Sequence, residues 1–358
     1  MWILRKIFVI IAYEIVSFET SSFREITRMI NRKFMISVFV ILLVISVGIV
    51  PAEETEKMQY KLKLEKGQKY YFKLVRDEQV TEMMAGEEET IERTLRLGTD
   101  FDVNDIDEKG NAWVRFTLRW LSTTYKTPTM EFNYDSKDKY SLSPPDVSVF
   151  FAMLGESYSA KISPEGSVIE MKDVDRVRNN VIKKFAFAPM QEELEKDMEQ
   201  IIGEEALKEN IEQDFCIYPD KPVGVGDSWN KTRKVTQGNP VIAENKWLLK
   251  ERSEGVATIE VVINIKTDPK PKEVGPMIFT EEVSGEAHGV IKIRESTGMI
   301  IFGNINTELS GVRTIQGGDF QKGQMSMSIP VRIIIVTDLY VSEREDEEGS
   351  PDPGYATD

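Results

Sequence analysis

The residues with the clearest capacity for nucleophilic chemistry are residues 226–229 (Gly-Asp-Ser-Trp), the single cysteine Cys216 and the single histidine His288. A tight turn into a strand uses the same residue types, because Gly supplies the turn, Asp or Ser bonds the turn backbone, and Trp begins the buried face. Alternation places His288 with Lys292 and Arg294 on an exposed strand face, whereas a Ser-His-Asp or Cys-His enzyme needs an oriented, buried histidine. The chain also lacks a Gly-x-Ser-x-Gly segment. We therefore predict a turn at 226–229, a small core residue at Cys216, and no catalytic residue.

A run of carboxylates at residues 100–107 (Asp-Phe-Asp-Val-Asn-Asp-Ile-Asp) suggests a cation site. An EF-hand loop needs Gly at its sixth position and Glu at its twelfth, but Asp105 and Asn111 stand at these places. Alternation instead predicts a strand edge that carries its carboxylates to solvent. One His and one Cys exclude a zinc or copper site of the usual ligands, so we predict no metal and no cofactor.

Acidic residues dominate the chain, because 60 Asp and Glu against 45 Lys and Arg give a formal net charge of −15. A surface of this sign repels nucleic acid and anionic lipid head groups, so we expect neither as a partner. A hydrolase that uses two carboxylates remains a further class, but so many acidic residues offer too many pairs for the sequence to select one. A single cysteine provides no intrachain disulfide, so stability must come from packing.

The N-terminal region predicts export. Residues 29–34 (Met-Ile-Asn-Arg-Lys-Phe) start basic, residues 35–50 are apolar, and Pro-Ala-Glu-Glu follows, which is the arrangement of a secretory signal. Residues 1–28 precede it, so either the start codon lies at Met29 or the chain has a true N-terminal extension. The apolar run is shorter than the about 20 residues of a spanning helix, which favours cleavage after residue 52 over retention of residues 35–50 as a membrane anchor.

Period-two patterns predict strands in both halves of the remaining chain. Residues 107–111 read as a hairpin turn between a strand over 90–103 and a returning strand. One buried face and one wet face are typical of an antiparallel sheet. Three apolar stripes show this alternation: Val114, Phe116, Leu118 and Trp120; Ala257, Ile259, Val261, Ile263 and Ile265; Met325, Met327, Ile329, Val331, Ile333 and Ile335.

Helical spacing interrupts these strands in the middle of the chain. Apolar residues recur at every third or fourth position in 174–185 and again in 190–202, and 204–215 reads as one more helix. The two flanking regions are rich in strands. We therefore predict a helical insert at 173–215 that packs on the sheet.

Residues 218–229 (Tyr-Pro-Asp-Lys-Pro-Val-Gly-Val-Gly-Asp-Ser-Trp) resemble a bacterial domain-of-unknown-function family of secreted or lipid-anchored proteins. Weaker agreement occurs at residues 64–70, 134–136, 163–168 and 296–299, and at Gly155 before a strand. The resemblance covers roughly residues 60–341. It implies an envelope or extracellular address and no established activity, so it assigns no functional residues. The chain lacks the lipid-attachment Cys of the anchored members, which argues against tight anchoring.

These patterns predict an α+β fold, a curved, mostly antiparallel β-sheet with a central helical insert. Residues 1–28 form an N-terminal extension or a mis-assigned start, and residues 29–52 a signal peptide or membrane anchor. A single β-rich domain occupies 53–342, and the acidic tail 343–358 is predicted to be disordered. We expect this protein outside the inner membrane, as a periplasmic, outer-surface or secreted protein that meets the membrane only through its N-terminal segment.

The stripes also predict function. We expect a non-enzymatic domain that binds an apolar ligand or an envelope protein in a groove between sheet and helices, because three long apolar faces meet only short helices. The sequence does not name the ligand-binding residues or the oligomeric state. Two alternatives are a scaffold, which would have a solid core, and a carboxylate hydrolase, which would have two acids that face each other in a cleft.

Overall fold

A computed structural model describes residues 56–84, 86–138, 148–184, 198–236, 240–274, 277–317 and 325–343. The predicted N-terminal extension, the signal segment and all of the acidic tail beyond Glu343 lie outside these ranges. Within them, no helix combines the length and the apolar character that crossing a membrane requires.

One antiparallel sheet of 13 strands dominates the structure. Strand accounts for 63% of the described residues and helix for 13%, so the predicted α+β class with a central helical insert is wrong. The strands are more numerous than the sequence patterns indicate, and they are long, with 20 residues in β2 alone. They are β1 (Lys69–Met84), β2 (Glu87–Ile106), β3 (Ala112–Lys126), β4 (Glu131–Asp135), β5 (Ser157–Ile162), β6 (Val168–Lys172), β7 (Ser228–Val235), β8 (Val241–Ser253), β9 (Val256–Thr267), β10 (Lys272–Val274), β11 (Met277–Arg294), β12 (Ile300–Gly317) and β13 (Met325–Glu343).

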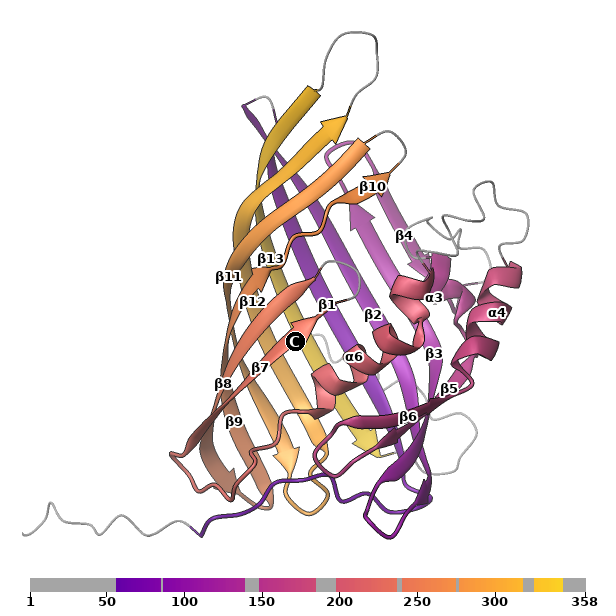
Figure 1. The fold of residues 1–358 in the computed structure, drawn as a ribbon, viewed down its shortest axis with the longest axis vertical. Helices are drawn as coiled ribbons and strands as arrows, with labels where there is room; N and C mark the ends of the chain where they lie inside the picture. The colour runs from indigo at the N-terminus through magenta and orange to yellow at the C-terminus, as the bar shows by residue number, and fades with distance from the viewer. Residues whose placement is uncertain are drawn as a thin grey trace, which may run out of the picture. The chain divides into compact units, whose positions relative to one another are not determined.

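The strand order joins the two halves of the chain at the middle of the sheet. Eleven strands follow one another as β6-β5-β3-β2-β1-β13-β12-β11-β9-β8-β7, while β4 pairs with β3 and β10 with β11. The first strand, β1, therefore lies beside the last, β13, as the indigo and yellow ribbons of Figure 1 show. The predicted turn at 107–111 is confirmed between β2 and β3, where Gly110 has a φ of 81°.

The sheet is strongly curved, and two glycines permit close approach of its strands (Figure 1). A Cβ on Gly285 would lie 1.9 Å from the carbonyl oxygen of Glu308, and one on Gly311 would lie 1.9 Å from that of Glu282. Only a residue without a side chain fits such approaches, so these positions allow β11 and β12 to coil. The side of the sheet that faces α6 (Glu204–Phe215) is called the inner face below.

Two helices occur where the sequence predicts them, α4 over Val174–Lys184 and α6 over Glu204–Phe215, and a further short helix, α3, spans Ser148–Ala152. Of the predicted helix over 190–202, residues 198–202 are helical and residues 190–197 lie outside the described residues. The apolar stripe of α4 packs mainly on these other helices, with Val177 and Val181 fully buried. Leu118 and Tyr158 of the sheet pack against the same cluster. These short elements do not form a layer over the sheet, which is why they do not make the fold α+β.

Helix α6 links the two outermost strands of the sheet. The Glu212 Oε1 accepts a hydrogen bond of 2.8 Å from the amide nitrogen of Val168, where β6 begins. On its other side, the Glu209 carboxylate accepts bonds of 3.0 and 3.1 Å from the amide nitrogen of Thr236, just beyond β7. The Arg233 Nη1 donates to the Gln213 carbonyl at 2.5 Å, which places a cation at the negative end of the helix dipole.

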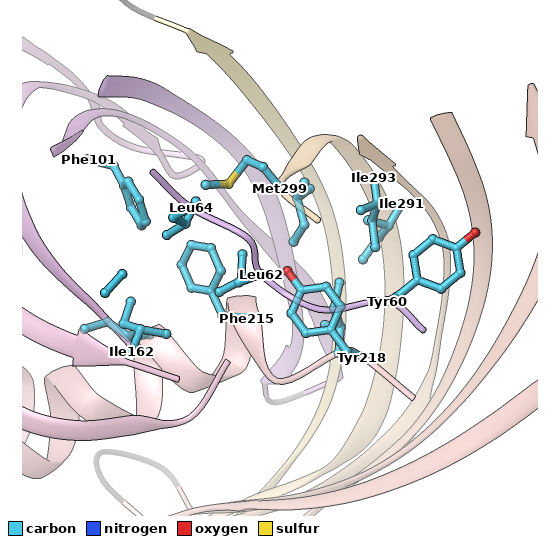
Figure 2. Close-up of a cluster of buried hydrophobic side chains, with 14 of the residues drawn as sticks. Tyr60, Leu62, Leu64, Phe101, Ile162, Phe215, Tyr218, Ile291, Ile293 and Met299 are labelled. Atoms are coloured by element: carbon cyan, nitrogen blue, oxygen red, sulfur yellow. The ribbon is translucent and has the colours of Figure 1, made fainter. Parts of the chain in front are cut away.

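A large buried cluster, the lower cluster, lies where α6 meets the inner face (Figure 2). Phe215 of α6 contacts Phe72 and Phe101, with ring centroids 6.1 and 5.6 Å apart. The N-terminal segment 60–64 crosses this cluster, and Tyr218 donates a 2.8 Å hydrogen bond to the carbonyl of Gly298. Fully buried members come from both halves of the sheet and include Phe101, Ile162, Ile259, Ile293 and Met299.

A smaller buried cluster, the upper cluster, lies on the inner face of β11 and β13. It consists of Val283, Ile329, Val331 and Ile333, with Val80, Leu309, Ile315 and Ile335 packed against it. Gly311 lies between Val283 and Val331 in the strand register, so no side chain separates these two valines. The predicted third stripe is confirmed here, although Met327 at its start is exposed.

Candidate functional site

The predicted turn at residues 226–229 is confirmed. Gly226 has a φ of 92°, and β7 begins at Ser228. The Asp227 Oδ2 accepts a 3.0 Å hydrogen bond from the amide nitrogen of Gly224. This bond, together with the ion pair to Lys57, lowers the pKa of Asp227. The half-buried Trp229 stacks on Trp247, so the segment turns the chain into β7 and packs its tryptophan against β8.

The single cysteine and the single histidine lie on different elements of the fold. Cys216 follows α6 and is half-buried, and burial raises the pKa of its thiol. Its nearest polar partner is the Ser167 hydroxyl at 3.6 Å. His288 lies on the outer face of β11, exposed as predicted, with its Nε2 atom 3.3 Å from Glu286.

The acidic run at residues 100–107 is only partly as predicted. Asp105 is exposed, but Asp100 and Asp102 are buried, so the expectation that the strand carries its carboxylates to solvent is wrong for these two. The reason is the neighbouring strand, because Arg119 and Arg115 of β3 cover them at 2.5 and 3.0 Å. Among the described residues, no group of three or more His, Cys, Asp or Glu side chains is placed to hold a metal ion.

The feature that points to a binding site is a partly open stretch of the inner face on β1 and β2. On β1, Phe72 packs against the lower cluster and Val80 against the upper cluster. The residues of the same face between them on β1, and their partners on β2, are assigned to neither cluster. We call these residues the middle zone; it consists of Leu74, Arg76, Glu78, Arg93, Leu95 and Leu97, all half-buried.

Leucines line the part of the middle zone nearest to α6. Leu74 pairs with Leu97 across the two strands, and Arg76 pairs with Leu95. On the other side of β1, Leu74 pairs with Leu339 of β13. Side chains at such paired positions lie about 5 Å apart, so the leucines form one continuous apolar surface.

Charged side chains occupy the rest of the middle zone. The Arg76 Nη2 lies 3.3 Å from the Glu78 carboxylate, and the side chain of Arg76 is 42% exposed. Arg93 lies directly opposite Glu78 in the register, and its guanidinium carbon is 5.6 Å from the ring centroid of Tyr125. The zone therefore combines apolar surface with accessible cations, which suits an amphipathic molecule.

One carboxyl group of α6 lies in an unusual environment. Burial raises the pKa of Asp214 to about 6, and the neighbouring charge of Arg233 opposes this rise. Burial raises the pKa of Tyr158, which stacks on Phe116 of the inner face, and the charge of Asp214 adds to this rise. Asp214 is nevertheless an exposed residue, so the protein atoms that surround its carboxyl group raise the pKa without excluding solvent from it.

The sequence patterns missed the middle zone, although a signal was present. In β1 the residues of one face read Phe72, Leu74, Arg76, Glu78 and Val80, so two charges interrupt an apolar stripe. In β2 one charge does the same between two apolar positions, in the alternation Ile91, Arg93, Leu95. Charges on an otherwise apolar strand face are a recognisable mark of a polar site on a buried side.

Comparison with solved structures finds only remote likenesses. A structure described as lipid-protein interactions in lipovitellin has a TM-score of 0.40 and 10% identity, and the match covers 80% of this chain but 26% of that one. An outer membrane channel from Pseudomonas putida F1 has a TM-score of 0.19 and 7% identity, covering 82% of this chain and all (100%) of that one. The beta domain of the Bordetella autotransporter BrkA has a TM-score of 0.18 and 8% identity, covering 77% and 99%. Scores of this size support no conclusion about function.

Comparison of the sequence with protein families identifies one family to which the chain belongs. No curated protein matches the chain. A family of unknown function, DUF6263, matches residues 109–300, a range that includes the turn at 226–229 and all of α6. This agrees with the predicted resemblance to a family without established activity, while the bacterial source and the secretion of its members stay predictions. Because the match covers more than half of the sequence, the chain belongs to DUF6263.

Proposed function

We propose that this protein is a non-enzymatic, extracytoplasmic domain that binds an apolar, lipid-like ligand on the inner face of its sheet. The observation that supports the proposal is the middle zone, where Leu74, Leu95 and Leu97 keep accessible surface between two buried clusters. Burial of apolar surface is worth about 25 cal/mol per Å². A ligand that covers these leucines therefore buries apolar surface that is exposed to water in the free protein, and this burial favours binding.

The dimensions of the open surface fit an extended chain better than a small compact molecule. Phe72 and Val80, which bound the middle zone on β1, are eight residues apart, or about 27 Å along an extended strand. Ile305 and Leu339 continue the apolar surface sideways onto β12 and β13, where both are half-buried. A ligand with a flexible apolar chain can contact this whole length.

The carboxylate chemistry of a hydrolase receives less support. A glycosidase places a second carboxylate within about 5–10 Å of the acid whose pKa is raised. Burial raises the pKa of Asp214, as it would for such an acid, but the charged group that acts on it is the cation Arg233 and not a second carboxylate. The thiol pKa of Cys216 is also raised, which lowers its nucleophilicity at neutral pH. We therefore propose binding, with the ligand-free scaffold as the competing outcome of the test.

The proposal is tested on protein recovered from the extracytoplasmic fraction of its host. Native mass spectrometry should detect a bound lipid-like molecule, and the folded, delipidated protein should bind Nile red. Leu74→Trp fills the middle zone and should reduce dye affinity by about tenfold, whereas Val75→Trp, on the opposite face of the same strand, should not.

Two results would count against binding. A ligand-free protein that is fully folded and does not bind the dye would leave the scaffold as the function. Equal dye binding by both tryptophan variants would show that the dye binds outside the middle zone.

A further inference from the structure

We propose that the ligand of the inner face is a single-chain lipid with one anionic carboxylate head group, and that Arg76 binds this carboxylate. The inference rests on the proposed binding function and adds the chemical class of the ligand. A long-chain fatty acid has this chemistry. The argument depends on the donors of Arg76, on the charges around it and on the surface that surrounds both.

Arg76 has donors to spare on the accessible side of the sheet. A guanidinium carries five N–H donors in a planar fork that matches a carboxylate. The ion pair with Glu78 joins Nη2 to the carboxylate at 3.3 Å, and the Arg76 side chain is 42% exposed. The Arg76 Nε is itself buried and has no hydrogen-bond partner among the described residues, so a ligand would reach the exposed Nη atoms. A bound carboxylate would therefore give Arg76 charge-assisted bonds that the free protein lacks.

The balance of charge in the middle zone favours an anion. Glu78 lies between two arginines, because Arg76 is two positions away on the same face of β1 and Arg93 is directly opposite on β2. The cation that stays accessible in the middle zone is Arg76, whose side chain is 42% exposed. A negative head group is attracted to this guanidinium, whereas a cationic head group would be repelled by it.

Two other polar sites on the inner face are less suited to an anion. In the upper part of the sheet, Arg313 is enclosed by two carboxylates, Glu281 at 2.6 Å and Glu82. On α6, the carboxyl of Asp214 repels an anion whenever it is ionised. The head group therefore belongs in the middle zone, from which the apolar chain extends over Leu74, Leu95 and Leu97.

The experiment compares three ligands with the same chain: hexadecanoate, hexadecan-1-ol and hexadecylamine, each measured by displacement of Nile red at pH 8. We expect hexadecanoate to bind about tenfold tighter than the alcohol, and the amine to bind most weakly, because a hydrogen bond to a charged group contributes about that factor. Arg76→Gln should remove the preference for the acid over the alcohol, and Arg76→Lys should retain part of it.

The matched control is Arg96→Gln on the outer face of β2. Arg96 also has a buried Nε without a partner among the described residues, but it lies opposite Val75, on the other side of the sheet. This variant should keep the wild-type preference for the acid.

The outcomes separate this inference from the proposed function. Equal affinity for the acid and the alcohol in the wild-type protein would overturn the anionic head group and leave apolar binding intact. A preference for the acid that persists in Arg76→Gln would overturn the role of Arg76. Tighter binding of hexadecyl phosphate than of hexadecanoate would overturn the carboxylate. Failure of all ligands and of the dye would overturn the proposed function itself.

Discussion

The lower cluster and the middle zone lie on the same face of the same two strands, yet one is buried and the other is half-open. Phe101 of β2 is fully buried, because α6 places Phe215 on it and β3 adds Phe116. Only four residues away on the same face, Leu97 remains half-buried. Alternation along a strand thus decides which face a side chain occupies, but the elements packed above that face decide whether it is buried.

This difference also separates the roles of the two regions. The lower cluster joins both halves of the sheet to α6 and to the N-terminal segment, so its packing maintains the fold. The middle zone contributes little packing of its own and leaves charged and apolar groups accessible. Binding sites commonly combine such under-packed surfaces with a rigid support.

The sharpest test of the comparison removes side-chain volume from each region. Phe101→Ala should lower the free energy of unfolding by about 3–5 kcal/mol, because it leaves a cavity among four aromatic rings. Leu97→Ala should cost only about 1 kcal/mol, because this leucine is half-buried already. Urea unfolding measures both values. A cost for Leu97→Ala as large as that for Phe101→Ala would show that the middle zone is a packed core.

A second pair of variants, with a smaller expected effect, tests whether the upper cluster depends on the close approach of β11 and β12 at Gly311. Gly311→Ala places a methyl group 1.9 Å from the backbone oxygen of Glu282, so we expect a loss of about 1–3 kcal/mol in urea unfolding. Gly303→Ala is the control, because its methyl group would lie 3.6 Å from the Leu339 Cβ, an ordinary contact. Equal stability of the two variants would mean that the sheet relaxes around Gly311 without loss.

Local features of the fold were predictable from the sequence. The hairpin at 107–111, the helix over 204–215 and the turn at 226–229 depend on residues close in the chain, and all three are confirmed. The apolar stripes were also predictable, because period-two alternation is a property of a single strand.

Features that depend on distant segments were not predictable in this way. The fold class failed because strand number and length depend on which segments pair, such as β1 with β13. Asp100 and Asp102 were expected to meet solvent, but the arginines that cover them come from the next strand. The extent of the middle zone was missed for the same reason. Charges in the apolar alternation of β1 and β2 indicate a polar site there, but only the packed structure shows where α6 stops covering the sheet.

The smallest expected effect concerns pH and uses two aspartates that flank the lower cluster. Burial raises the pKa of Asp214 to about 6 from the model-peptide value of 3.8, so its ionised form destabilises the folded state. Stability should therefore fall as pH rises from about 4 to above 6, and Asp214→Asn should raise the melting temperature at pH 7. Asp227 has a lowered pKa, because the Gly224 amide and Lys57 stabilise its charge. Asp227→Asn should accordingly lower the melting temperature at pH 7.

Thermal melts of both variants at pH 3 and pH 7 test these opposite signs. At pH 3 the Asp214 carboxyl is protonated in the folded and in most of the unfolded state, so Asp214→Asn should then differ little from the wild type. The stabilisation that ionised Asp227 supplies is also lost as pH falls through its lowered pKa. The melting temperatures of Asp227→Asn and the wild type should therefore lie closer together at pH 3 than at pH 7. If Asp214→Asn were instead destabilising at pH 7, its charge would be compensated by Arg233. The inner side of α6 would then stabilise a charged carboxylate as well as the outer surface of the protein does.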